Sequence, residues 1–192
     1  MSVTKDFIGE NRPVHKHTND SQQIRMTVHA SLMAALIAAG AYIAVPIGPV
    51  PIILQNMFVL LAGLLLGSRW GLAAVGVYLL AGAFGLPVFA FGTGGIGRFA
   101  GPTGGYLLGY LPAVFIAGLF SRFEKPLSDI LGLILGTAII YAMGVAWLEM
   151  VTGMGFSKAL AVGMYPFLIG DALKIAASVI ILKAVRPVIR KS

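Results

Sequence analysis

The chain has 192 residues, of which 58% are hydrophobic, 11% are charged and none is cysteine. The charged fraction is far below the ~25% of ordinary soluble domains, and the lack of cysteine excludes disulfides, thiolate chemistry and iron–sulfur ligation. The formal net charge of +7 is not arranged as a basic stripe mixed with aromatic residues, so the sequence predicts no nucleic-acid partner.

The N-terminal segment, residues 1–25, is polar and of mixed charge. It contains no apolar stretch of the kind found in a cleavable signal peptide, so it is not expected to be one. We expect a largely disordered cytoplasmic tail. His15 and His17 form a His-x-His pair in this segment. Because two histidines alone do not make a zinc site, we predict no metal site in the tail.

Six apolar stretches follow and predict an all-α membrane domain over residues 26–186, before a basic cytoplasmic tail over 187–192. At ~20 residues per span, the apolar part of the chain can hold at most six transmembrane helices. The expected helices lie near 26–46, 54–67, 70–86, 104–120, 127–150 and 163–185. Only Ser68, Arg69 and Trp70 join the second helix to the third, so these two helices are expected to form a tight membrane hairpin.

The positions of the fourteen Lys and Arg residues predict the orientation of the chain in the membrane. With the N-terminus inside the cell, eleven of them fall on the cytoplasmic side. Only Arg98 and Lys158 fall on the outer side, and Lys174 lies within the last helix. Since cytoplasmic loops carry the excess of positive charge, we predict six spans with both termini in the cytoplasm.

The outer connection between Pro87 and Gly105 is apolar and rich in glycine and aromatic residues. Long connections without secondary structure are usually functional or disordered, and this one is too apolar for disorder. We expect it to fold back over the bundle as a lid or pocket wall; the alternative is a passive cap on the helix ends. Gly92, Gly94 and Gly97 match G-x-G-x-x-G, but no strand or βαβ pattern accompanies them, so no dinucleotide site is predicted.

Asp171 and Lys174 are two charged residues inside the last apolar stretch. A charge at the centre of a membrane helix costs ~2.5–3.5 kcal/mol on the insertion scale, and such residues are usually functional. Three positions apart, they share one face of the helix and can partly neutralise each other. We interpret them as the polar floor of a ligand pocket in the outer half of the bilayer. The alternative is a structural ion pair or snorkelling by Lys174.

Two other polar residues lie near the outer surface. Gln55 begins the second expected helix beside a proline-rich loop, where it is either a hydrogen-bond donor to a ligand or a polar residue at a helix start. Glu149 ends the fifth expected helix and is expected at the membrane interface.

A row of small residues, Ala30, Ala34 and Ala38, lies on the first expected helix, with Ala35 and Ala39 beside it. Such a row makes a smooth face for a second helix. It therefore either packs inside the bundle or docks a partner subunit.

Three motifs together resemble the BioY family of biotin transporters. They are GLPVFAFGTGGIGRFAGPTGGYLLGY over residues 85–110, Pro51-x-x-x-Gln55 and Gly170-Asp171-x-x-Lys174. The resemblance covers about residues 25–186. It implies the substrate-binding S component of an energy-coupling factor transporter, with six helices and one vitamin pocket near the outer surface of the cell membrane. It further implies a transmembrane coupling protein that docks on the alanine row and two ATPase subunits, although some family members are thought to work without them.

The resemblance implies biotin as the ligand. Asp171 is then expected to accept a hydrogen bond from a ureido N–H group, and Lys174 to donate to a polar ligand atom. Arg98 is the candidate partner of the ligand carboxylate through a charge-assisted bond, with Lys174 on the carboxylate as the reverse pose. The expected pocket is completed by Phe89, Phe91 and Tyr106 around the apolar ring and by Gln55, Thr103 and Gly104.

Other functions fit the same features. One is an S component for a different vitamin. Another is a proton-coupled carrier of a small solute that uses Asp171 and Glu149 as a relay without an ATPase. No G-x-x-x-x-G-K-[ST] motif and no nucleophile–base–orienter set occurs in the sequence, so we predict neither an ATPase nor another enzyme, and no cofactor.

Overall fold

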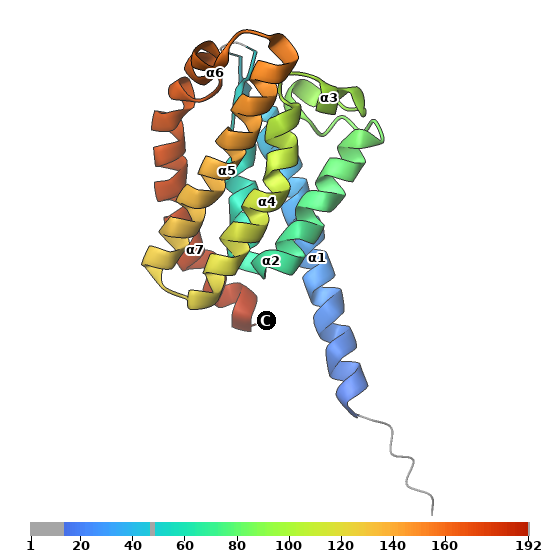
Figure 1. Ribbon diagram of the computed structural model, residues 1–192. Coiled ribbons are helices and arrows are strands. Elements are labelled where there is room, and N and C mark those ends of the chain that lie inside the picture. The colour runs from blue at the N-terminus through green and yellow to red at the C-terminus, as the bar shows by residue number, and fades with distance from the viewer. Residues whose placement is uncertain (1–13, 47–48, 192) are drawn as a thin grey trace, which may run out of the picture.

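The computed structural model describes residues 14–46 and 49–191 as a helical bundle with one small antiparallel hairpin (Figure 1). The long helices are α1 (Val14–Tyr42), α2 (Gln55–Ala83), α4 (Gly104–Phe120), α5 (Pro126–Thr152) and α7 (Leu168–Lys191). The short elements are β1 (Ala44–Val45), β2 (Ile52–Ile53), α3 (Gly97–Ala100), α6 (Phe156–Gly163) and the 3₁₀ turns η1 (Ala90–Gly92), η2 (Ser121–Phe123) and η3 (Tyr165–Phe167). The predicted helical fold class is confirmed.

The helix α2 folds back on itself at Gly67. This residue has φ 78° and ψ 174°, a conformation that glycine adopts without steric cost and that interrupts the helix. A Cβ atom on Gly71 would lie 3.0 Å from the Cα atom of Gly63, so residues on the two sides of the kink touch. The chain reverses direction here, at the lower end of the bundle in Figure 1. The predicted hairpin is therefore present.

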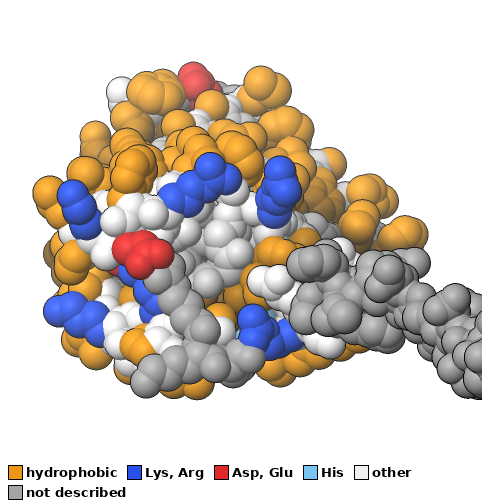
Figure 2. Space-filling model, turned by 90° about the horizontal axis from the view of Figure 1, so that it is seen from below, with side chains coloured by type: hydrophobic (Ala, Val, Ile, Leu, Met, Phe, Trp, Pro, Cys, Tyr) orange, Lys and Arg blue, Asp and Glu red, His pale blue; other side chains and the backbone are white. Residues whose placement is uncertain are grey.

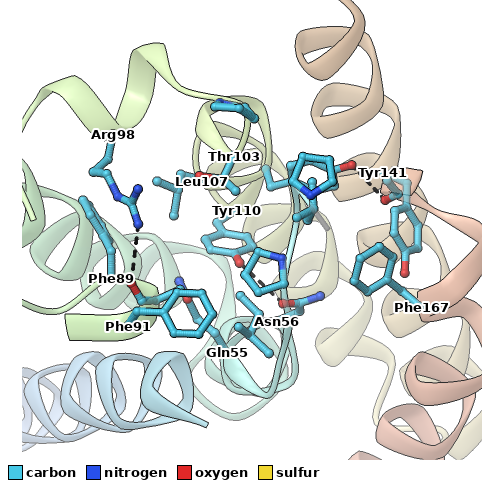
Figure 3. Close-up of a pocket in the computed structure, with 18 residues that line it drawn as sticks. Gln55, Asn56, Phe89, Phe91, Arg98, Thr103, Leu107, Tyr110, Tyr141 and Phe167 are labelled. Carbon is cyan, nitrogen blue, oxygen red and sulfur yellow. Dashed lines mark hydrogen bonds between the residues drawn. The ribbon is translucent and has the colours of Figure 1, made fainter. Parts of the chain in front are cut away.

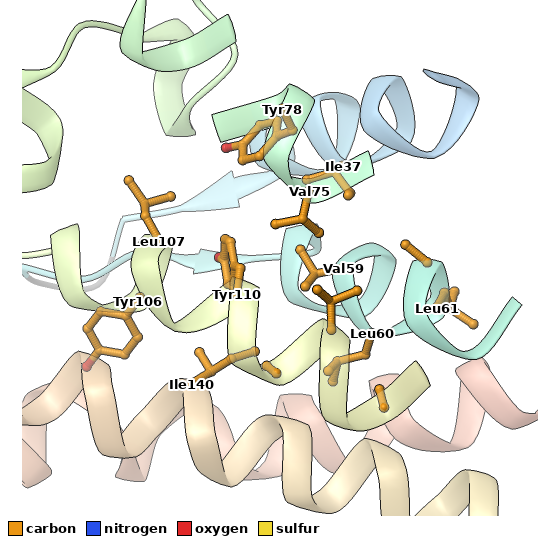
Figure 4. Close-up of a cluster of buried hydrophobic side chains, with 14 of the residues drawn as sticks. Ile37, Val59, Leu60, Leu61, Val75, Tyr78, Tyr106, Leu107, Tyr110 and Ile140 are labelled. Atoms are coloured by element: carbon orange, nitrogen blue, oxygen red, sulfur yellow. The ribbon is translucent and has the colours of Figure 1, made fainter. Parts of the chain in front are cut away.

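The helix α4 lies between α2 and α5, and α1 packs on α2. Close approach of α2 and α4 depends on glycine, because a Cβ atom on Gly118 would lie 2.3 Å from the backbone nitrogen of Ser68. Apolar side chains fill the space between these helices (Figure 4). The bundle thus has one continuous apolar core, which includes Ile37, Val59, Leu61, Val75, Tyr110 and Ile140.

Four helices in the described part of the chain are long and apolar enough to cross a membrane by length and composition: Asp20–Tyr42, Gln55–Ala83, Gly104–Phe123 and Pro126–Thr152. One of these, α2, contains both arms of the hairpin. When the two arms are counted separately and α7 is added, six long helical segments run through the described chain. Large apolar side chains such as Leu32, Ile134 and Ile180 lie exposed on the outside of the bundle.

The N-terminal tail, expected to be largely disordered, is helical where the structure describes it. Residues 14–25 form the first turns of α1, which project below the bundle in Figure 1, whereas residues 1–13 lie outside the described chain. The segment 14–25 contains no glycine or proline, so nothing separates it from the apolar helix that it continues, and elongation needs no new nucleus. His15 and His17 belong to this helical segment.

At the other end of the chain, α7 continues through Pro187 to Lys191. A proline inside a helix removes one N–H donor, here the partner of the Lys183 carbonyl, and near an exposed helix end water can satisfy that carbonyl. The expected last helix over 163–185 is also divided. Its start is the end of α6 and the turn η3, and α7 begins only at Leu168.

The two ends of the bundle differ in charge. The kink of α2, the α4–α5 connection and the C-terminal part of α7 meet at one end, and Figure 2 shows Lys and Arg side chains on this face with hydrophobic side chains around it. We call it the basic end; its residues include Arg69, Arg122, Lys125, Lys183 and Arg186. The connections with few charges, among them the loop between α2 and α4, lie at the opposite end (Figure 1).

Candidate ligand-binding site

A cavity of about 210 Å³ lies at the end of the bundle opposite the basic end. Side chains from the β1–β2 connection, the start of α2, the α2–α4 loop, α4 and α5 surround it (Figure 3). Its lining is mostly apolar and aromatic, with a few polar groups, which is typical of a site for a small ligand.

The α2–α4 loop forms one wall of the cavity and is firmly anchored. Phe89 is only 2% exposed, and its ring packs edge to face on Tyr78 and on Phe99, at centroid distances of 5.6 and 5.7 Å. From α5, the Trp147 Nε1–H group donates to the Gly101 carbonyl at 3.0 Å. The expected folding of this loop over the bundle as a pocket wall is confirmed, with Phe91 adding an exposed ring to the lining.

Arg98 is the cation of the cavity. It lies on the short helix α3, half-buried, and its Nη2 atom donates to the Ala90 carbonyl over a long distance of 3.5 Å. A guanidinium has five N–H donors, so most of its hydrogen-bonding capacity is left for another acceptor. Figure 3 shows Arg98 near Phe89 and Phe91 on one side of the cavity, with Tyr141 and Phe167 on the other.

Two amide side chains from the start of α2 reach the lower part of the cavity. Gln55 is buried, and its Nε2 atom donates to the Tyr78 hydroxyl at 2.7 Å. The Oδ1 atom of Asn56 accepts a longer hydrogen bond, 3.4 Å, from the Tyr110 hydroxyl. Within the described residues, no group of three or more His, Asp or Glu side chains could hold a metal ion.

Asp171 and Lys174 form the expected ion pair, but they lie just behind the cavity wall. Lys174 Nζ is 2.9 Å from Asp171 Oδ1, and the Tyr141 hydroxyl donates to Asp171 Oδ2. The pair lines a separate void of about 10 Å³, roughly the space of one water molecule, together with Asn56 and Ser178. Tyr141 lines the main cavity and bonds to the pair, and Asn56 lines both the cavity and the small void.

Most of the predicted site residues come together in the structure. The cavity is lined by Gln55, Phe89, Phe91, Arg98, Thr103 and Tyr106. Gly104 is not part of the lining; it is buried where a Cβ atom would lie 1.8 Å from the Phe99 carbonyl oxygen. Asp171 and Lys174 do not line the cavity either; they line the small void behind its wall.

Several lining residues escaped the sequence analysis, including Asn56, Leu107, Tyr110, Tyr141 and Phe167. Tyr110 could have been found, because it follows Tyr106 by four positions and therefore shares its helix face. Asn56 is a second amide next to Gln55 in an apolar helix, which is a similar signal. Tyr141 gives no local signal, since its partner Asp171 lies thirty positions further along the chain.

The alanine row on α1 faces the bundle. Ala30 and Ala34 are 6% and 8% exposed, and Ala38 is half-buried. The prediction that these residues dock a partner is wrong for Ala30 and Ala34, because their side chains already pack against the rest of this chain. The exposed small residues of α1 form the neighbouring row, Ser31, Ala35 and Ala39.

Comparisons with known proteins agree with this architecture. The model of the BioY family matches residues 14–191. A probable biotin transporter BioY of Pyrococcus horikoshii is 44% identical over 151 residues, which cover 79% of this chain and 90% of the relative. The biotin transporter BioY of Thermotoga maritima is 40% identical over 159 residues, which cover 82% and 94%.

A solved structure is also similar along most of its length. It is the crystal structure of the S-component for biotin from an ECF-type ABC transporter, with a TM-score of 0.82 and 31% sequence identity. The match covers 87% of this chain and 93% of the solved one. With its sequence motifs, its helical bundle and these matches, the chain belongs to the BioY family.

Proposed function

We propose that this chain is the biotin-binding component of a vitamin uptake transporter, a multi-pass protein of the prokaryotic cell membrane that captures biotin from the outer side. One observation carries the proposal: the cavity has a cation, Arg98, on one side and Tyr141 on the other, and the Tyr141 hydroxyl donates to the Asp171–Lys174 ion pair behind the cavity wall. Biotin has a carboxylate at one end and a ureido ring at the other, so its two polar ends match this arrangement. Relatives named as biotin transporters support the same ligand.

The proposed orientation has six membrane passes and both termini in the cytoplasm. The passes are α1, the two arms of α2, α4, α5 and α7. Its support is the basic end, which carries Arg69, Arg122 and Lys183, because positive charge collects on the cytoplasmic side of membrane proteins. In this orientation the cavity opens toward the outside of the cell.

In the proposed binding mode, Arg98 binds the biotin carboxylate through charge-assisted hydrogen bonds, which are shorter and stronger than neutral ones. Phe89, Phe91 and Tyr106 enclose the apolar ring. Asp171 accepts from a ureido N–H group, and Lys174 balances the charge of Asp171 and donates to a polar ligand atom. No covalent step is needed for capture.

The function is tested by equilibrium titration of the purified protein in detergent with biotin, thiamine, riboflavin and niacin in competition. We expect saturable binding of biotin at one site and no displacement of biotin by the other three vitamins. Binding of another vitamin in preference to biotin would show that the ligand is assigned incorrectly. Flux driven by a pH gradient in liposomes without an ATPase would instead favour the proton-coupled carrier.

We also propose that an energy-coupling subunit, with two ATPase subunits, docks on the exposed face of α1. The row of Ser31, Ala35 and Ala39 leaves space for the close approach of another helix, and Leu32 and Leu36 beside it are exposed as well. The solved S-component for biotin is from an ECF-type ABC transporter, which supports a partner of this kind.

Ala35→Trp is expected to reduce biotin uptake several-fold in cells that contain the coupling module, because the indole ring blocks close approach at α1. Binding of biotin by the purified variant should stay unchanged. Ile134→Trp is the matched control, since Ile134 is 48% exposed on α5 and lies on another face. Normal uptake by the Ala35 variant would place the docking face elsewhere.

A further inference from the structure

Tyr141 stands between the ligand cavity and the ion pair. Tyr141 lines the cavity, and its hydroxyl donates to Asp171 Oδ2, which lies outside the lining. Asp171 is only 5% exposed, and its other oxygen accepts from Lys174 at 2.9 Å. Asp171 itself does not line the cavity, and its Oδ2 atom is already occupied by the Tyr141 hydroxyl.

Tyr141 and its neighbour Tyr106 are held in different ways. Tyr106 is fixed from two sides: its hydroxyl donates to the Gly163 carbonyl at 2.8 Å, and its ring sits in a recess where a Cβ atom on Gly144 would lie 2.3 Å away. The hydroxyl of Tyr141 bonds to a side chain, Asp171, which accepts from the ligand in the proposed binding mode. Loss of the hydrogen bond between Tyr141 and Asp171 would free Asp171 Oδ2 for another donor, while Tyr106 stays in place.

We propose that the Tyr141 hydroxyl is an exchangeable cap on Asp171, which gives way when a ligand N–H group takes its place on the carboxylate. The inference rests on the proposed biotin site. The exchange replaces one donor on Asp171 Oδ2 by another, so the buried carboxylate stays satisfied in both arrangements. A ligand without an N–H donor cannot make the exchange, and the cap therefore favours ligands that carry one.

The cap is tested with Tyr141→Phe, which removes the hydroxyl and keeps the ring. Because the ligand then no longer competes with the hydroxyl, the dissociation constant for biotin is expected to fall about tenfold, the lower end of the range for a hydrogen bond to a charged group. For a biotin analogue methylated on both ureido nitrogens, which has no N–H donor in the ring, the variant and the wild type should bind equally. The control is Tyr165→Phe, at an exposed position on η3 outside the cavity lining, which should leave both ligands unaffected.

Each outcome of the titration either supports or overturns the cap. Weaker binding of biotin by Tyr141→Phe would show that the hydroxyl is itself a ligand contact, and unchanged binding would show that it takes no part; either result overturns the cap. Tyr141→Met also lacks the hydroxyl and provides the same comparison where the Phe variant does not fold. If the wild type binds no biotin, the proposed function fails, and that result is distinct from failure of the cap.

Discussion

Asp171→Asn is expected to weaken biotin binding by roughly 10- to 150-fold, the range that follows from ~1.5–3 kcal/mol for a hydrogen bond to a charged group. The substitution keeps the shape of the side chain and removes its charge. A ureido N–H group then loses an ionised acceptor, and Lys174, whose ammonium lies 2.9 Å from Asp171 Oδ1, is left without its counter-charge beside the ligand. The measurement is an equilibrium titration of both proteins in the same detergent.

Asp129→Asn is the matched control for this effect. Asp129 on α5 forms an ion pair with Arg186 on α7, with bonds of 2.7 and 2.8 Å, but this pair lies at the basic end of the bundle. We expect this variant to unfold at a lower temperature and to bind biotin normally. Tight binding that survives Asp171→Asn and Lys174→Ala would remove the site assignment, and equal losses in both aspartate variants would point to a general loss of structure.

Arg98→Ala is expected to weaken biotin binding by roughly 10- to 100-fold and to leave the binding of biotin amide nearly unchanged. The reason is that a guanidinium forms paired, charge-assisted bonds with a carboxylate and has no such preference for a neutral amide. Arg98→Lys should bind biotin more weakly than the wild type and more tightly than Arg98→Ala, because an ammonium keeps the charge but not the planar pair of donors. The measurement is a titration of each variant with both ligands.

The comparison of the two ligands distinguishes the two possible poses. Equal losses for biotin and for biotin amide would show that Arg98 does not bind the carboxylate. If Lys174→Ala instead removes the preference for biotin over its amide, the ligand lies in the reverse pose, with its carboxylate at the α7 side of the cavity.

Much of the fold follows from local features of the sequence. The expected helix over 104–120 coincides with α4, because a glycine- and proline-rich loop precedes it and the apolar stretch ends at Phe120. The short joint at Ser68 to Trp70 predicts the hairpin in α2, but the chain reverses at Gly67 and the joint residues are helical. The ends of α1 and α7 could not be predicted from apolarity, since α1 begins in polar sequence and α7 continues through Pro187 into polar sequence.

The site was predictable only in part. Arg98 and the aromatic residues of the α2–α4 loop stand out in the sequence, and Asp171 and Lys174 stand out as charges in the last apolar stretch. The bond between Tyr141 and Asp171 depends on how α5 packs against α7, which periodicity does not reveal. On α1, the rows 30/34/38 and 31/35/39 have the same spacing of small residues, so the sequence alone does not show which one faces the bundle.

The location of the ligand is tested most directly by determining the structure of this protein with biotin bound. We expect biotin in the cavity between α2, α4, α5 and the α2–α4 loop. Its carboxylate should lie within hydrogen-bonding distance of Arg98, and a ureido N–H group should donate to Asp171. Biotin bound outside this cavity, or inside it without contact to either Arg98 or Asp171, would contradict the proposed binding mode.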